Sequence, residues 1–398
     1  MPTLFTTQPA AYPPERSYSG YKKTSVFSKW QRELQQQQYE QACYWMAEAD
    51  ASGWQDDIWN KLIVFASKQV HVHVPTLPTV LARNYAYYRN YVQTNSAQQI
   101  THQPRNCIAL RQHMCQAVGL VALSAKGPVY TLPKVDISKV DESKLIVGVH
   151  SWLVAHRKPN DSEVVIRILS TILWNLDTHN TPDVMYWLSV LLAYDKQQRK
   201  NKTPIQMASR APLPTTDKIR QLSVDPKSTN DWVWLLWLAL DTASGHYKRP
   251  AACQRALRDL CYLFAFDYKS SKKTTLIPIM IHAMHLVRTD AIDWTSSIYT
   301  NAQSKTMIIK ACTNIDVMYA EVERRRHANL EHAAKEAEHA NGAPPTPDVN
   351  TTPSETSAKA VTKPAVQPPQ KHKKGGMSEA SKSKMDTMDA IDDHLFFY

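Results

Sequence analysis

Glycine is scarce in this chain, and the scarcity limits the folds open to it. Only nine of the 398 residues are glycine, whereas globular proteins average about 7%. Tight β-turns use glycine for its positive φ angles, while a glycine inside a helix costs about 1 kcal/mol relative to alanine. Dinucleotide and P-loop sites need several glycines close together, because a Cβ would keep the backbone from the phosphates. The sequence therefore predicts an all-α protein without such a loop.

The spacing of apolar residues supports helices along most of the chain. Apolar side chains recur every three to four residues, as expected for helices with one buried face. The predicted helical runs cover residues 28–49, 54–65, 79–92, 105–125, 145–155, 163–176, 182–194, 232–242, 251–266, 276–287 and 303–339. A polar loop is predicted at residues 196–217.

Changes in composition divide the chain into five segments. Residues 1–24 form a predicted flexible arm, and two helical units follow at residues 25–135 and 140–325, separated by a linker rich in Pro, Lys, Asp and Ser. Residues 326–340 are charged and rich in alanine, which predicts a projecting, solvated helix. Residues 341–398 hold too few apolar side chains to bury a core. The predicted architecture is two consecutive helical units, a long projecting C-terminal helix and a disordered tail.

The chain carries a net charge of +11, all of it before the tail. Residues 340–398 contain seven lysines and seven acids, so residues 1–339 hold the whole excess. An excess of this kind favours polyanions such as DNA or RNA, although proteins that bind neither also show it. The predicted loop at 196–217 concentrates basic side chains, and five of them are our candidate nucleic-acid contacts: Lys196, Arg199, Lys200, Lys202 and Arg210. A merely solvated loop is the alternative.

The C-terminal end combines acidic and aromatic residues. Residues 386–398 hold four acids and no lysine. The candidate partner-binding residues are Asp392, Asp393, Leu395, Phe396, Phe397 and Tyr398. Aromatic anchors beside acids suit a docking peptide that binds a basic groove. The end is similar to the acidic, aromatic-tipped tails of single-stranded-DNA-binding proteins and to the clamp-binding termini of replication polymerases. A chance pattern, or a contact with the protein's own basic body, is the alternative.

The sequence shows no constellation typical of catalysis or metal binding. Histidines occur at metal-like spacings at His71 and His73 and at His282 and His285, but no third ligand lies near either pair in sequence. Six scattered cysteines without a Cys-x-x-Cys pair indicate buried, reduced thiols. No ordered Ser-His-Asp set or nucleophile elbow is identifiable. We therefore expect no catalytic residue, cofactor or metal; an enzyme whose site is built from distant residues is a third possibility.

Two stretches in the first helical unit follow a recognisable pattern. The first contains Ser25-x-Phe27-x-Lys29-x-x-Arg32, Ala42-x-Tyr44-Trp45-x-Ala47 with Gly53 eight residues after the tryptophan, and Leu62-x-x-Phe65-Ala66-Ser67. The second contains Gln116-Ala117, Ala122, Ala125-Lys126 and Val129-Tyr130. Together, residues 25–130 resemble the C-terminal helical region of RarA/MgsA-type AAA+ ATPases, which are relatives of clamp loaders. The ATPase domain of that family is absent from this sequence, so the resemblance implies no ATP hydrolysis.

The resemblance implies a collar-like module that holds subunits together in replication-fork machinery, with Tyr44, Trp45 and Trp59 in its core. We expect a non-enzymatic accessory protein of DNA replication or repair, virus-encoded or otherwise streamlined. It would oligomerise through its helical domains, contact DNA with its basic body and recruit replication proteins through its C-terminal tip. A structural or virion-type protein that makes only protein contacts is the alternative. Without an apolar run of about 18 residues or a secretory signal, we expect an intracellular protein, at a nuclear, cytoplasmic or viral replication site.

Overall fold

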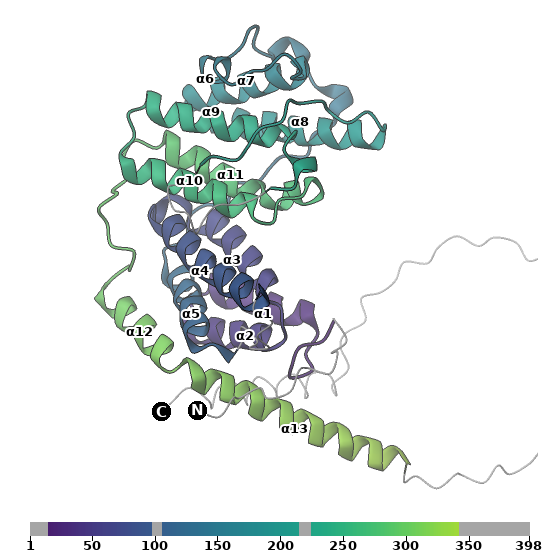
Figure 1. The fold of residues 1–398 in the computed structure, drawn as a ribbon, viewed down its shortest axis with the longest axis vertical. Coiled ribbons are helices and arrows are strands. Elements are labelled where there is room, and N and C mark those ends of the chain that lie inside the picture. Colours follow the sequence, from purple (N-terminus) through teal and green to yellow (C-terminus); the bar gives the residue numbers. More distant parts are fainter. Residues whose placement is uncertain (1–14, 98–105, 215–223, 342–398) are drawn as a thin grey trace, which may run out of the picture. The chain divides into compact units, whose positions relative to one another are not determined.

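The computed structural model describes residues 15–97, 106–214 and 224–341, and in these ranges the chain is built from α-helices and short 3-10 turns (Figure 1). The described residues contain no β-strand beyond one isolated bridge between Arg16 and Lys22. The all-α class predicted from glycine scarcity and helical periodicity is therefore confirmed. The α-helices are α1 Lys23–Gln35, α2 Tyr39–Ala51, α3 Gln55–Gln69, α4 Leu77–Ala97, α5 Ile108–Leu123, α6 Ser151–Val154, α7 Glu163–Asp177, α8 Thr181–Lys200, α9 Trp232–His246, α10 Ala251–Ala265, α11 Lys273–Arg288, α12 Ala302–Thr313 and α13 Ile315–Asn341.

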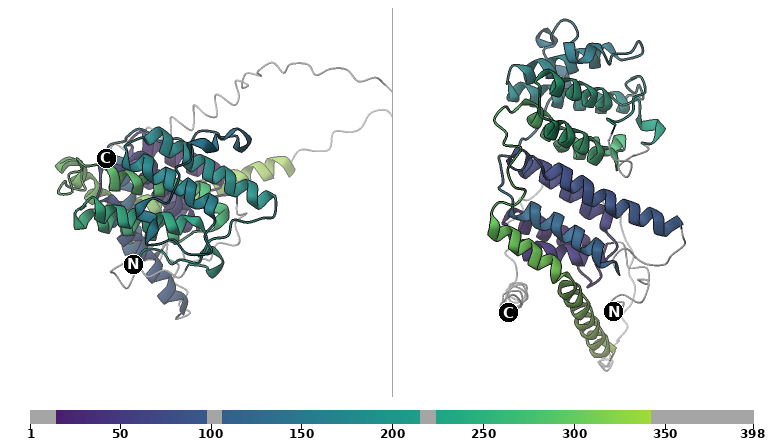
Figure 2. Two further views of the ribbon diagram at one scale, coloured as in Figure 1. Left: turned by 90° about the horizontal axis from the view of Figure 1, so that it is seen from above. Right: turned by 60° about the vertical axis from the view of Figure 1, so that its left-hand side comes forward.

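The helices form two groups stacked along the molecule (Figures 1 and 2). The first group contains α1 to α5, and the second contains α6 to α11. The groups meet where α3 packs on α11 and α4 packs on α10. Tyr85 of α4 lies 4.1 Å from Phe266, between ring centroids, at this junction. A single cluster of buried apolar side chains runs through both groups, with tryptophans at its centre in each.

The chain returns to the first group after α11. α12 packs on α5 and α13 packs on α2, so residues 302–322 adjoin helices that the chain formed some 200 to 300 residues earlier (Figure 2). Arg111 of α5 binds Asp316 of α13 at 2.6 Å, and the hydroxyl of Tyr319 donates to Asp50 of α2 at 2.5 Å. Val322 is fully buried, whereas side chains from His327 to His332 are exposed. These contacts place α12 and the start of α13 in space with the first group, although they follow the second group in sequence.

Four predicted boundaries were wrong. The single helix predicted at residues 28–49 is two helices, because the chain turns at Gln37, whose φ is 61°. Only residues 151–154 of the predicted helix 145–155 are helical, since Gly148 adopts a φ of 104°. The predicted helix at 303–339 breaks between α12 and α13 at Asn314. The fourth error is the loop at 196–217, whose first five residues continue α8.

None of the described helices combines the length and apolar character that crossing a membrane requires. All six cysteines are free thiols. The sulfur atoms of Cys43 and Cys115 lie 3.6 Å apart.

Candidate nucleic-acid interface

Four of the five predicted basic contacts lie at the C-terminal end of α8. Lys196, Arg199 and Lys200 lie on the last two turns of the helix, and Lys202 follows directly in a left-handed backbone conformation with a φ of 61°. All four residues are exposed. Lys196 and Lys200 are four residues apart and therefore neighbour each other on the helix surface. This helix end presents a small cationic surface. Cations at a helix C-terminus also stabilise the helix, because they interact favourably with its dipole.

Arg210 is buried instead, as the centre of a polar anchor. Its guanidinium donates to Asp161 Oδ1 at 2.8 Å and to the carbonyl oxygens of His156 and Ala208, both at 2.8 Å. Backbone N–H groups also donate to the Asp161 carboxylate. Burial opposes ionisation of Asp161, but these hydrogen bonds, led by those from Arg210, hold the pKa of this carboxyl below its usual value. We therefore leave Arg210 out of any surface that contacts phosphate.

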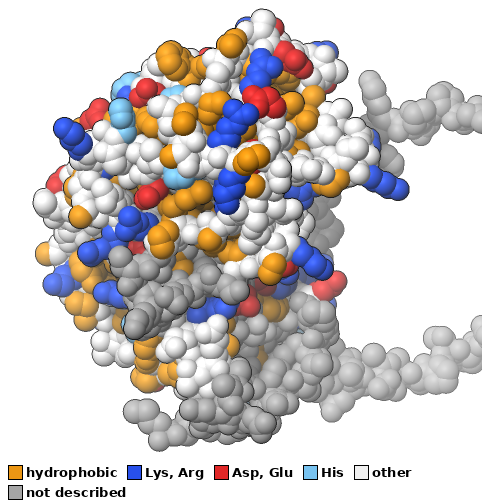
Figure 3. Space-filling model, turned by 45° about the horizontal axis from the view of Figure 1, so that its top comes forward, with side chains coloured by type: hydrophobic (Ala, Val, Ile, Leu, Met, Phe, Trp, Pro, Cys, Tyr) orange, Lys and Arg blue, Asp and Glu red, His pale blue; other side chains and the backbone are white. Residues whose placement is uncertain are grey.

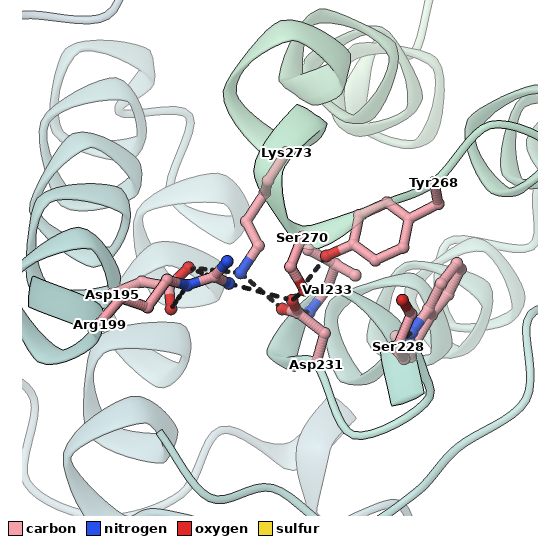
Figure 4. A network of polar contacts seen from close by, with 9 residues as sticks. Asp195, Arg199, Ser228, Asp231, Val233, Tyr268, Ser270 and Lys273 are labelled. Carbon is pink, nitrogen blue, oxygen red and sulfur yellow. Dashed lines mark hydrogen bonds and ion pairs between the residues drawn. The ribbon is translucent and has the colours of Figure 1, made fainter. Parts of the chain in front are cut away.

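Arg199 belongs to a network of charged side chains that joins three helices (Figure 4). Its guanidinium binds both carboxylate oxygens of Asp195, each at 3.0 Å. Lys273, at the start of α11, lies between Asp195 and Asp231, with its ammonium 2.5 and 2.7 Å from their oxygens. Lys273 is 2% exposed. Two acids and two cations thus balance, as burial of charge requires.

Asp231 connects this network to the start of α9. Its carboxylate accepts hydrogen bonds from the Tyr268 hydroxyl at 2.6 Å and from the Ser270 hydroxyl at 3.0 Å, and it caps the helix at Val233 N (Figure 4). Burial and the Asp231 charge raise the pKa of Tyr268, which keeps its proton available to donate. Although burial opposes it, Asp195 and Asp231 hold the pKa of Arg199 above its ordinary value. Arg199 is therefore a permanent charge at the edge of a rigid scaffold.

A cavity of about 260 Å³ opens beside this network. Asp195, Arg199 and Asp231 line it together with Ser270. Lys227, an exposed residue of the turn Pro226–Ser228, adds another cation to the lining. The cavity therefore has a balanced ion network in its wall, in which Arg199 is partly exposed, and one further exposed cation, Lys227.

A larger groove, of about 590 Å³, lies between α1, α3 and the start of α11. It is lined by amide and basic side chains over a short apolar floor. The lining is Gln31, Arg32, Gln35, Asp57, Asn60, Lys61, Val64, Phe65, Lys68, Gln69, Asp267, Lys272, Thr275 and Leu276. Amide groups both donate and accept hydrogen bonds, and the cations attract phosphate, so this lining suits a polar, anionic polymer.

Both acids of the groove are engaged by lysines. Asp57 binds Lys23 at 2.5 Å, and Asp267 binds Lys272. Lys61 lies over the Phe27 ring, with its ammonium 4.9 Å from the centroid. The exposed Lys68 forms no ion pair with any described acid. Arg32 binds Glu33 at 2.7 Å, so Lys61 and Lys68 are the cations of the lining that pair with no described acid, and they make the groove positive.

The turn Ser270–Lys272 connects the groove to the cavity. Lys272 lines the groove, while Ser270 lines the cavity beside Arg199. The cations on either side form a series that we call the basic track. Its members are Arg32, Lys61, Lys68, Lys272, Lys227, Arg199, Lys196 and Lys200. The track unites residues separated by more than 200 positions in the sequence, and only Lys196, Arg199 and Lys200 were among the predicted contacts.

Lysine and arginine side chains are spaced over the surface rather than fused into one patch. Figure 3 shows them on one face, set apart by uncharged and apolar side chains. Spaced cations can each neutralise a separate phosphate, and this arrangement suits a contact along a polymer better than one small anion.

Histidines that the sequence pairs by spacing converge at the junction of the two helix groups. The ring centroid of His71 lies 5.4 Å from that of His73 and 6.5 Å from those of His282 and His285. Tyr130 stacks on His285 at 4.0 Å. His71 has a φ of 31°, which is strained for a residue with a side chain. A Cβ added at Gly127 would lie 2.5 Å from His73 Nε2, so only glycine fits beside these rings.

Burial keeps the His71, His282 and His285 rings of this cluster neutral, because it lowers the pKa of each. It lowers the pKa of His282 to about 3 and that of His285 to about 4, and neighbouring His71 adds to both shifts. Within residues 15–97, 106–214 and 224–341, no three His, Cys, Asp or Glu side chains are placed to hold a metal ion. The buried rings of His71, His282 and His285 thus form a neutral aromatic contact between the helix groups. Sequence spacing identified its members but not their convergence.

The predicted partner-binding residues 392–398 lie outside the described residues. Comparison with known proteins gives no match to a family model, to a curated protein or to a solved structure.

Proposed function

We propose that this protein is a non-enzymatic accessory protein of DNA replication or repair that binds nucleic acid along the basic track. The observation that carries the proposal is the run of cations from the groove between α1, α3 and α11 to the end of α8. Lys68, Lys196 and Lys200 are exposed and pair with no described acid. Neutralising phosphates with such lysines releases counterions, which drives binding of nucleic acid. The resemblance of residues 25–130 to a clamp-loader collar favours DNA as the polyanion.

Salt dependence of binding is the direct test. We expect a fluorescent DNA 20-mer to bind at low salt and to lose at least a hundredfold in affinity between 50 and 200 mM salt, because several phosphate contacts release counterions together. Undetectable binding at the lowest salt would reject the proposal. It would favour the alternative reading, in which the helices make protein contacts only.

Matched charge variants locate the contact. The double variant Lys68→Ala/Lys200→Ala removes two track cations, and the slope of log affinity against log salt should become shallower by about 2. The control variant Lys305→Ala/Lys310→Ala removes two exposed lysines of α12, a helix that contributes nothing to the track. Alanine preserves helix propensity at all four positions. Equal slopes for the two variants would show that the track does not contact the phosphates.

A further inference from the structure

A groove lined by aromatic side chains lies on the second helix group, away from the basic track's own groove. It has a volume of about 660 Å³ and is formed by the segment before α6 together with α7 and α8. Trp174, Tyr186 and Trp187 supply its rings, and Lys144 and Ile146 line its side. A hydrogen bond of 3.0 Å from Ile146 N to the Thr171 hydroxyl fixes that side to α7. The groove is therefore built from anchored elements.

The groove leaves one large aromatic side chain in contact with solvent. Trp174 is 51% exposed, although most of the other tryptophans in the structure are buried. Val147, which follows Ile146, is 94% exposed. Exposed apolar side chains that gather beside a groove mark an interaction site, whereas single ones need no explanation. Tryptophan also has the largest aromatic ring system, so its stacking on a flat partner contributes a large favourable free energy to binding.

The polar groups of the groove limit what that partner is. Lys144 supplies a cation at one side, and Asp183 supplies a carboxylate that repels phosphate. Asp183 accepts a hydrogen bond of 2.7 Å from Asn180, which fixes its position. A nucleobase carries no charge and has N–H groups, such as the N3–H of thymine, that can donate to such a carboxylate. The lining thus suits bases inside the groove, with phosphates outside it toward the lysines.

α8 connects this groove to the basic track. Tyr186 and Lys200 are fourteen residues apart, which is close to four full helical turns, so they lie on the same side of α8. Gln197 lies between them on that side and is exposed. The distance along the helix axis is about 21 Å. A polymer that extends from the aromatic groove toward the C-terminal end of α8 would therefore reach Lys196 and Lys200.

From these observations we infer that the groove of Trp174 and Tyr186 stacks the bases of single-stranded nucleic acid, whose backbone continues along α8 to the basic track. This inference rests on the proposed function, and it specifies the form of nucleic acid that is bound. In a duplex the base faces are already stacked, and only base edges are accessible. An unpaired strand offers the free faces that an exposed tryptophan binds. Single-stranded DNA should therefore bind more tightly than a duplex of equal length.

The test compares a 20-nucleotide oligothymidylate with a 20-base-pair duplex. Trp174→Ala should weaken binding of the single strand about tenfold, the expected loss of one stacked base, without changing its salt slope. Trp174→Phe keeps a ring and should bind within about threefold of the unchanged protein, which separates stacking from misfolding. Tyr87→Ala is the matched control, because Tyr87 is 42% exposed on α4, outside the groove. It should leave single-strand affinity unchanged.

The outcomes separate this inference from the proposed function. If Trp174→Ala binds the single strand as well as the unchanged protein does, or if duplex and single strand bind equally, the inference is overturned. If the Lys68→Ala/Lys200→Ala variant still shows a shallower salt slope in that case, the basic track stands. If no nucleic acid binds at low salt, both proposals fail.

Discussion

At the scale of single residues, Arg210 shows that a basic residue in a polar stretch of sequence can be buried in an ion pair instead of exposed to a ligand. As a basic residue in a polar stretch, it was predicted to face phosphate. In the structure its side chain is 2% exposed, and its two terminal nitrogens bind Asp161 and two backbone carbonyl groups. An ion pair in such a place is neutral in total, yet either charge alone would be strongly disfavoured. Asp161 and Arg210 therefore act as one structural unit that holds the segment around residue 208 against the α6–α7 connection.

Removing one member of this pair should destabilise the protein. Asp161→Asn leaves the Arg210 charge buried without compensation, and we expect the free energy of unfolding to fall by about 3 kcal/mol. The control is Glu163→Gln, which breaks the exposed pair between Arg157 and Glu163 and should lower it by less than about 1 kcal/mol. Urea denaturation of both variants at pH 7 gives the comparison. Similar losses for the two would show that Arg210 finds other compensation.

At the scale of elements, the histidine cluster fastens the turn His71–His73 to α11. His71 is strained and needs the glycine at 127 beside it. Since backbone strain persists only where the surrounding structure enforces it, the contact between the two helix groups must supply that enforcement. The neutral state of the rings is part of this contact, because charging a buried imidazole would expel it or draw in water.

This contact should make stability depend on pH. The unfolded protein binds protons at these histidines near pH 6.5, whereas burial lowers the folded-state pKa of His282 to about 3 and of His285 to about 4. Below pH 6.5 the unfolded state binds more protons than the folded state, so stability falls as pH falls. From pH 6.5 to 5.5 we expect the two residues together to remove about 2 kcal/mol from the free energy of unfolding.

The variant His282→Leu separates the contribution of His282 to the pH dependence of stability from the contribution of the acidic residues. Leucine does not titrate and fits an apolar site. The decrease in the free energy of unfolding between pH 6.5 and 5.5 should therefore be smaller by about 1 kcal/mol, half of the expected total. Urea denaturation at both pH values gives the difference. An unchanged pH dependence in this variant would show that His282 does not carry the effect.

Helix bounds were predicted correctly where the sequence carries a local signal for them. They were predicted wrongly where the sequence carries no local signal. Apolar spacing located α3, α7 and α10 to within a few residues, because each buries one continuous face. The breaks at Gln37 and Asn314 have no glycine or proline to announce them. The groove between α1, α3 and α11 could not be predicted at all, because it exists only once elements more than 200 residues apart have packed. Lys61 and Lys68 carry no local signal that separates them from ordinary surface lysines.

At the scale of the whole chain, basic and acidic residues are distributed unequally between regions. The excess of lysine and arginine lies in residues 1–339, whereas the last thirteen residues hold four acids and no lysine. The surface that we propose for polyanion binding is thus on the same chain as a short acidic, aromatic segment. Such a segment suits a second macromolecule with a basic, apolar groove. If both assignments hold, the protein connects nucleic acid to another protein, which is the role we expect of a replication accessory.

Truncation of the last thirteen residues tests that connection. If Phe396, Phe397 and Tyr398 are the apolar anchors that we propose, protein lacking residues 386–398 should recover no replication proteins in a pull-down, while its DNA binding keeps the salt slope of the full chain. A deletion of equal length at residues 345–357 removes no such anchors and serves as the control. Triple replacement of the three aromatic residues by alanine should reproduce the truncation, because the acids alone attract a partner but do not hold it. Equal recovery of replication proteins by the truncated and full-length chains would remove the C-terminal segment from the proposed role and leave the basic track as the part of the chain that binds other macromolecules.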